Sequence, residues 1–188
     1  MTNSPPPPSS FFELIRTETL PSLGPEVRSG VKESGVLLPD VDNYCESHAI
    51  SGTQRNLLRS AALLWHDDLD GSHNFSQEIN SSEGSFLHGI MHRREPDSSN
   101  AKYWFRLVGN HPAFAELAEA VEALDSTSEN QRLTSSLSNQ GEWEPFAFVD
   151  ACSRAMQGKR DSSNYEFLQK VQELEFNTLV SQILRSTA

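Results

Sequence analysis

Hydrophobic residues recur at intervals of three and four along most of the chain, which is the spacing of helices with one buried face. In the centre, this pattern predicts one helix from Thr53, a suitable N-cap, to about Ile79. No alternation typical of strands continues over more than a few residues. The sequence therefore predicts an all-α protein, folded as a single-domain irregular helical bundle. Further helices are expected at 99–109, 111–124, 145–157 and 163–185, with a short helix or irregular turn at 86–95.

The N-terminal part is interrupted by proline and glycine, which end helices. We expect short helices at 11–19 and 25–34, followed by an extended connection up to Gly52. The expected organisation is a disordered Pro/Ser-rich leader at 1–9, a helical domain at 10–188 with its core block at 53–125, and a mobile Ser/Thr/Asn/Gln-rich link at 125–142.

The composition excludes several classes of function. The 188 residues carry a formal net charge of -11 and have a mean hydropathy of -0.51. Such a chain lacks the cationic surface that duplex nucleic acids and anionic membranes require, so we expect neither as a partner. The longest apolar run near the centre, 61–65, is too short to span a membrane. Cys45 and Cys152 form no C-x-x-C pair, which favours a reducing compartment and a cytoplasmic location.

Candidate chemistry lies in the central helix. His66, Asp70 and His73 stand at positions i, i+4 and i+7, so a continuous helix would present them on one face. A buried helix normally carries apolar side chains at such positions. We therefore take these three residues as candidate catalytic groups, with a histidine acting as an acid or base oriented by the carboxylate.

The next segment repeats this spacing with His88, His92 and Glu95. Two such faces packed together would resemble the metal sites that helical bundles build from imidazole and carboxylate. These ligand types suit zinc, iron or manganese. A buried histidine–carboxylate network that only fixes helix packing is the structural alternative. The candidate metal ligands are His66, Asp70, His73, His88, His92 and Glu95.

Three familiar motifs are excluded in this region. The stretch that begins "HDDLDG" lacks the terminal carboxylates of a calcium loop, because His66 and Gln77 occupy its first and twelfth positions. The His-Glu-x-x-His sequence of zinc proteases is absent. The adjacent His66–Asp67 pair alone does not define a metal-dependent phosphohydrolase.

A basic and aromatic stretch follows at 92–106. Its arginines and lysine suit a carboxylate or phosphate, and three consecutive aromatic rings cannot all be buried on one face. The candidate ligand is therefore a small anionic or aromatic molecule. In the alternative interpretation, the arginines pair with nearby aspartates and the rings belong to the core. The candidate substrate-binding residues are Arg93, Arg94, Lys102, Tyr103, Trp104 and Arg106.

The strings "WHDDLDGSHNFSQ" and "HGIMHRREPDSSNAKYWFRLVGNHP" resemble the central signature of a family of uncharacterised microbial proteins, over about residues 60–115. The resemblance implies no activity, fold or cofactor. From the residues alone, we expect an enzyme that hydrolyses or isomerises an anionic small molecule, using a metal or a histidine. The alternative is a non-enzymatic helical module that binds a small molecule or partner and contains a structural polar network.

Overall fold

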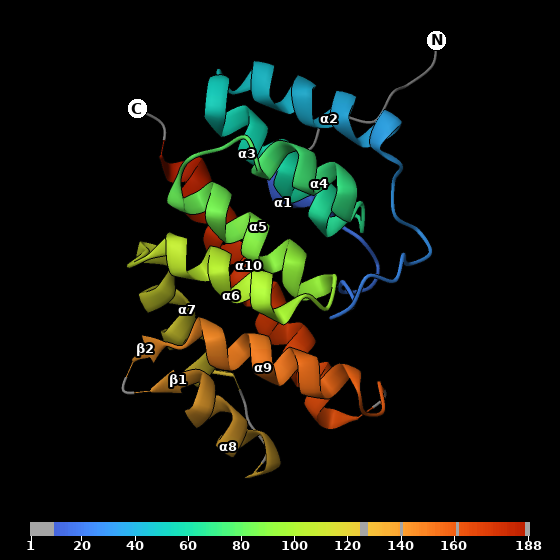
Figure 1. The fold of residues 1–188 in the computed structure, drawn as a ribbon. Helices are drawn as coiled ribbons and strands as arrows, with labels where there is room; N and C mark the ends of the chain where they lie inside the picture. Colours follow the sequence, from blue (N-terminus) through green and yellow to red (C-terminus); the bar gives the residue numbers. More distant parts are fainter. Residues whose placement is uncertain (1–9, 125–127, 140, 161, 187–188) are drawn as a thin grey trace.

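The computed structural model describes residues 10–124, 128–139, 141–160 and 162–186 (Figure 1). Over these residues the fold is all-α apart from one short antiparallel hairpin, as the sequence predicts. The predicted leader at 1–9 lies outside the described residues. The elements are α1 Phe11–Leu14, α2 Ser34–Ser47, α3 Gly52–Trp65, α4 Leu69–Ser76, α5 Ser82–Arg94, α6 Ser98–Val108, α7 Pro112–Glu122, α8 Ser128–Leu137, β1 Ser138–Asn139, β2 Glu142–Trp143, α9 Pro145–Met156 and α10 Ser163–Arg185.

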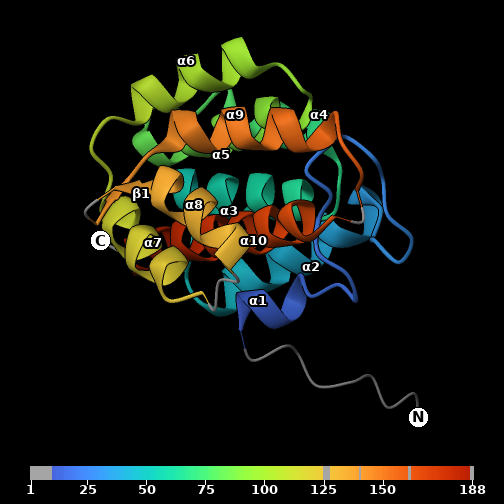
Figure 2. The same ribbon diagram turned by 90° about the horizontal axis from the view of Figure 1, so that it is seen from below.

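The long helix α10 holds the bundle together. It runs behind α5 in Figure 1, and Figure 2 shows α3 and α10 between α5, α6 and α9 on one side and α1 and α2 on the other. Its first half, including Leu168 and Val171, packs into the cluster formed with α7 and α9. Its second half, including Phe176 and Leu179, packs into the cluster formed with α2, α3 and α5. The same helix therefore belongs to both hydrophobic clusters.

The N-terminal part corrects the sequence prediction. Helix α1 ends at Leu14 instead of residue 19, the segment 25–33 is not helical, and α2 occupies most of the predicted extended connection. Pro39 lies inside α2, and because proline is unfavourable within a helix, it favoured the extended connection predicted for this segment. The stripe that determines the helix is Leu37, Val41 and Cys45, all buried at a spacing of four. Burial of this stripe outweighs the unfavourable proline.

The central helix predicted at 53–79 is also wrong, because the chain breaks between α3 and α4. Asp67 adopts a left-handed backbone conformation with φ of 66°. Asp68 then caps α4 by accepting a hydrogen bond of 2.8 Å from the Gly71 N–H. His66 consequently lies at the end of α3, on a different helix from Asp70 and His73.

The expected mobile link at 125–142 contains regular structure. Helix α8 and strand β1 lie within it, and Ser138 of β1 pairs with Trp143 of β2. Leu137 is fully buried against the α7–α9 cluster, so this residue anchors the end of α8 to the bundle. Residues 125–127 and 140 of the predicted link lie outside the described residues.

Candidate metal centre

Three histidines from two helices meet at one place. Helix α4 carries His73, and α5 carries His88 and His92 one turn apart. The ring centroids lie 4.7 Å apart for His73 and His88, 5.6 Å for His73 and His92, and 4.8 Å for His88 and His92. One ring nitrogen from each histidine falls within 4.8 Å of the other two. We call these three residues the histidine triad.

Helix packing fixes the position of the triad. Ser81 caps α5 by accepting a hydrogen bond of 3.1 Å from the Gly84 N–H. Farther along α5, Gly89 lets α6 approach closely, because a methyl group added there would lie 3.0 Å from Cε2 of Phe105. This approach brings the Trp104 indole of α6 onto the His88 ring at a centroid distance of 3.8 Å and an angle of 13°. The indole thus covers one face of the triad.

Two side chains orient the His92 ring. Its Nδ1 lies 3.0 Å from Oε2 of Glu95, and a carboxylate only accepts hydrogen bonds, so Nδ1 carries the proton. Its Nε2 then has a free lone pair, and the Asn100 amide donates to it over 3.0 Å. Metal-binding histidines are commonly held by a carboxylate in this way. A metal at Nε2 would replace the Asn100 contact.

Burial keeps His88 and His92 in the neutral form that a metal needs. His88 is 2 % exposed, and its Nδ1 is buried without a hydrogen-bond partner in the described structure. Burial, followed by the neighbouring His92 and His73, lowers the pKa of His88 to about 3. Burial also lowers the pKa of His92, although Glu95 opposes this change. Their lone pairs are therefore free of protons at neutral pH.

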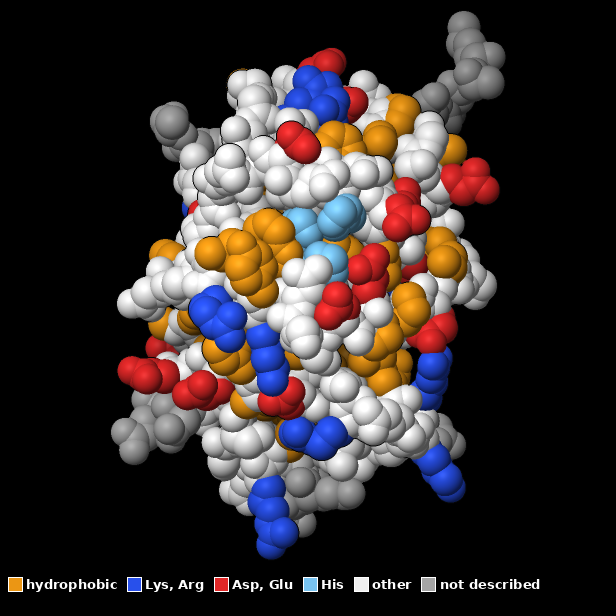
Figure 3. All heavy atoms as spheres, in the orientation of Figure 1, with side chains coloured by type: hydrophobic (Ala, Val, Ile, Leu, Met, Phe, Trp, Pro, Cys, Tyr) orange, Lys and Arg blue, Asp and Glu red, His pale blue; other side chains and the backbone are white. Residues whose placement is uncertain are grey.

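The triad is reachable from solvent. His73 is only partly buried, and Figure 3 shows histidine side chains at the surface, between a hydrophobic patch and acidic side chains. Metal–nitrogen bonds near 2.0–2.1 Å place tetrahedral ligand nitrogens about 3.3 Å apart. The observed limit of 4.8 Å requires small side-chain rotations to reach this geometry. Three ligands with one open side leave room for water on the metal.

The structure separates the other three candidate ligands from this group. His66 is buried at the end of α3, and its Nδ1 accepts a hydrogen bond of 3.0 Å from the Lys32 backbone N–H. Asp70 is exposed in the first turn of α4. Glu95 contacts the Nδ1 side of His92, so it would orient this ligand and would not bind the metal itself. The sequence analysis did not identify Asn100. An asparagine in the first turn of a helix does not by itself indicate a contact with a histidine on another helix.

The two candidate anion-binding arginines are buried in ion pairs. Arg93 binds Glu175 with hydrogen bonds of 2.9 and 2.5 Å, and Arg94 binds Asp67 over 2.7 Å. Each arginine is 1 % exposed. The alternative in which arginine pairs with a nearby aspartate is thus confirmed for Arg94. Sequence reasoning missed the partner of Arg93, which lies on α10.

The remaining candidates lie on α6. Lys102 pairs with Asp150 over 2.6 Å, and the guanidinium of Arg106 lies over the Phe146 ring at 5.3 Å. The Tyr103 side chain is half exposed and its ring contacts that of Trp104. Among these residues, the structure places Trp104 in direct contact with the triad.

We predict that the metal-free protein loses stability as the pH falls below 6.5, with His66 as one cause. Burial, followed by the charges of Lys32 and Arg28, lowers the pKa of His66 from 6.5 to about 4. The unfolded chain therefore binds more protons than the folded one between pH 6.5 and pH 4. Urea unfolding at pH 7 and pH 5 should show a loss on the order of 1–2 kcal/mol from this residue. A His66→Gln variant that keeps the same pH dependence as the wild type would contradict this assignment.

Comparison of the chain with protein-family models, curated proteins and solved structures finds no match. The signature noted in the sequence thus carries no function to this chain. Among the described helices, none has the length and apolar character needed to cross a membrane. The fold and the site define an all-α protein with a three-histidine candidate metal centre, and the triad is the basis for a functional proposal.

Proposed function

We propose that this protein is a zinc-dependent hydrolase whose metal is held by His73, His88 and His92. The observation that carries the proposal is the gathering of three ring nitrogens within 4.8 Å on a partly open surface. Catalytic zinc sites commonly combine three protein ligands with one water, and zinc lowers the pKa of that water to about 7. Hydrolysis then adds hydroxide to the electrophilic atom of the substrate and a proton to the leaving group.

The ligand chemistry favours zinc over the other metals considered. All three gathered donors are imidazoles, which suit zinc, copper, iron and nickel, whereas manganese prefers carboxylates. The Glu95 carboxylate accepts a hydrogen bond from His92 Nδ1, so it is not one of the gathered metal ligands. Iron(II) oxygenase sites usually add a carboxylate ligand to two histidines. A three-imidazole set with a carboxylate behind one ring is a common arrangement for zinc.

The electrostatics favour a metal-activated water over a histidine base. A general base works best when its pKa lies near the working pH. His88, with a pKa of about 3, is a weak base at neutral pH but a good metal ligand. This difference supports hydrolysis over an isomerisation in which His88 abstracts the proton.

A second candidate is the non-enzymatic module with a structural polar network. It is favoured by the Asn100 amide, which donates a hydrogen bond to the Nε2 lone pair of His92. The two candidates differ in what zinc does. The hydrolase requires zinc to replace the Asn100 contact, whereas a structural network gains nothing from metal.

The test is zinc uptake combined with hydrolysis. Protein purified without a histidine tag is stripped with a chelator, reloaded, and assayed for bound metal and for cleavage of p-nitrophenyl acetate and p-nitrophenyl phosphate. We expect one zinc per chain and cleavage of at least one ester above the zinc-free rate. Failure to bind zinc would refute both the metal centre and the hydrolase. An absence of zinc uptake would favour the second candidate, whereas stoichiometric zinc without cleavage of either ester would support the metal centre and count against the hydrolase.

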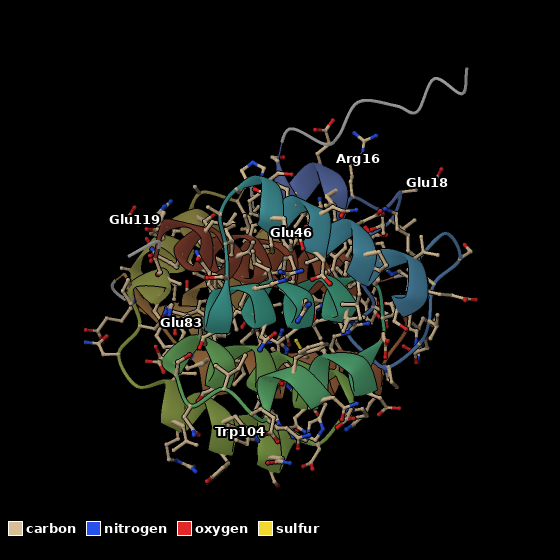
Figure 4. The ribbon with its side chains drawn as sticks, turned by 90° about the horizontal axis from the view of Figure 1, so that it is seen from above. Arg16, Glu18, Glu46, Glu83, Trp104 and Glu119 are labelled. Carbon is tan, nitrogen blue, oxygen red and sulfur yellow. The ribbon has the colours of Figure 1, made fainter. Side chains whose placement is uncertain are left out.

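We predict that Glu95→Gln weakens zinc binding by about 10–100-fold, the usual effect of removing a carboxylate behind a metal-bound histidine. The amide no longer stabilises the Nδ1–H tautomer of His92 as a carboxylate does. Competition with a chromogenic chelator measures the affinity. Glu119→Gln is the matched control, because Glu119 is exposed and lies at the periphery in Figure 4. Equal affinities of the two variants would contradict the role of Glu95.

A further inference from the structure

An open hollow of about 620 Å³ adjoins the site. Its walls come from the segment 25–34, the break between α3 and α4, the first turn of α4, and Glu95. Glu95 also binds His92, so this residue belongs to both the hollow and the surroundings of the triad. Figure 3 shows acidic side chains next to the histidines on this face. The hollow is therefore positioned to hold part of a substrate.

The hollow is negatively charged after its ion pairs are considered. Asp67 binds two guanidiniums, Arg28 at 2.8 Å and Arg94 at 2.7 Å, so this cluster carries one surplus positive charge against the four remaining carboxylates of the wall. Lys32, a cation in the wall, is paired with Asp40 at 2.8 Å. Among the described residues, no basic side chain pairs with Glu33, Asp68 or Asp70 of the wall, and the remaining acid, Glu95, binds His92. An anion would be repelled here.

The inner wall is an uncharged imidazole. His66 lines the hollow and is 3 % exposed. Its Nδ1 accepts a hydrogen bond from the Lys32 backbone N–H, and the ring also interacts with the Ile15 backbone. Because this ring is neutral at pH 7, it adds no positive charge to the hollow.

Apart from Ser34, the rest of the wall is apolar. Pro25, Val27, Val31 and Leu69 line the hollow beside the carboxylates, and Val27 is 70 % exposed. A hydrocarbon group could cover these side chains while a positive group faces the acids. Such a ligand combines hydrophobic burial with charge-assisted hydrogen bonds.

We propose that this hollow binds the protonated amine and apolar body of a small organic substrate. The binding site stands on the geometry and charge of the hollow, whereas its role as a substrate site rests on the proposed hydrolase function. The substrate class is thus an ester or amide that carries an amine. This class replaces the anionic one expected from Arg93, Arg94, Lys102 and Arg106. The first two guanidiniums are used in buried ion pairs, Lys102 pairs with Asp150, and Arg106 lies over the Phe146 ring.

The test compares three probes that share one apolar body: benzylamine, benzyl alcohol and benzoate. Binding is measured by NMR titration on zinc-free and zinc-loaded protein. We expect benzylamine to bind about tenfold more tightly than benzyl alcohol, because hydrogen bonds to charged groups are the stronger ones. Benzoate should bind most weakly. Higher salt should weaken benzylamine binding and leave benzyl alcohol unchanged.

The Glu33→Gln/Asp70→Asn variant should weaken benzylamine binding by about five- to tenfold and leave zinc affinity unchanged. Glu18→Gln/Glu119→Gln removes the same charge from two exposed positions that do not line the hollow, and it should bind like the wild type. Equal binding of benzylamine and benzyl alcohol, or equal losses in the two double variants, would overturn the proposal. Zinc uptake without benzylamine binding would refute the hollow alone, whereas benzylamine binding without zinc uptake would support the hollow and refute the hydrolase.

Discussion

Replacing Glu175 by leucine is expected to lower the free energy of unfolding by about 3–5 kcal/mol, because it leaves the guanidinium of Arg93 buried without its counter-charge. Arg93 and Glu175 are 1 % and 0 % exposed and share two hydrogen bonds. Burial alone raises the pKa of the Glu175 carboxyl, and the Arg93 charge opposes that change. Each ion is therefore stable in the interior because the other is present.

Urea unfolding of the wild type and the variant measures this loss. The double variant Arg93→Met/Glu175→Leu should regain most of the lost stability, because an apolar pair of similar size has no charge to desolvate. The Arg93 guanidinium also lies 4.2 Å from the Phe148 ring centre, and methionine retains a contact with that ring. A loss below about 1 kcal/mol for Glu175→Leu alone would contradict the interpretation, since that is the range of an exposed pair.

This ion pair also supports the candidate site. Arg93 follows His92 directly in α5, and its partner lies on α10, which belongs to both hydrophobic clusters. Arg94, the next residue, ties α5 to the break between α3 and α4 through Asp67. These two pairs thus hold the end of α5 on two sides. We infer that they fix the positions of the triad rings on α5.

The fold class was predictable from hydrophobic spacing, but the positions of breaks were not. The helices at 145–157 and 163–185 were predicted almost to the residue. Pro145 marks the start of the first, and a capping serine marks the start of the second, although the cap is Ser162 and not the predicted Ser163. The break after Trp65 was missed because the apolar pattern continues past it to Leu69. The run of capping-type residues ending at Asp68 was the available signal.

The site was predictable where it depends on one helix. His88 and His92 lie one turn apart within α5, so their spacing was sufficient to place them on one face. His66 was misplaced because its assumed helix ends before it. The roles of Arg93 and Arg94 depend on partners 82 and 27 positions away, and such distant pairings leave no periodic pattern in a sequence.

His88→Ala is expected to weaken zinc binding by more than about 100-fold, since even loss of a residue behind a ligand costs 10–100-fold. The wild type, at a free zinc concentration one thousand times the Kd, should gain about 4 kcal/mol of stability, and the variant should lose most of this gain. Thermal unfolding with and without zinc measures the difference. The affinity itself is measured by chelator competition.

Two further variants separate ligand loss from packing loss. His88→Ala also removes the ring under Trp104, so its metal-free form should be less stable than the wild type. His73→Gln changes a partly buried side chain and should leave the metal-free stability nearly unchanged, yet it should abolish most of the zinc-induced stabilisation. His48→Ala is the control, because His48 is exposed and stacks on Tyr44 outside the triad. If His73→Gln and His48→Ala retain equal zinc affinity, the triad is not a metal centre.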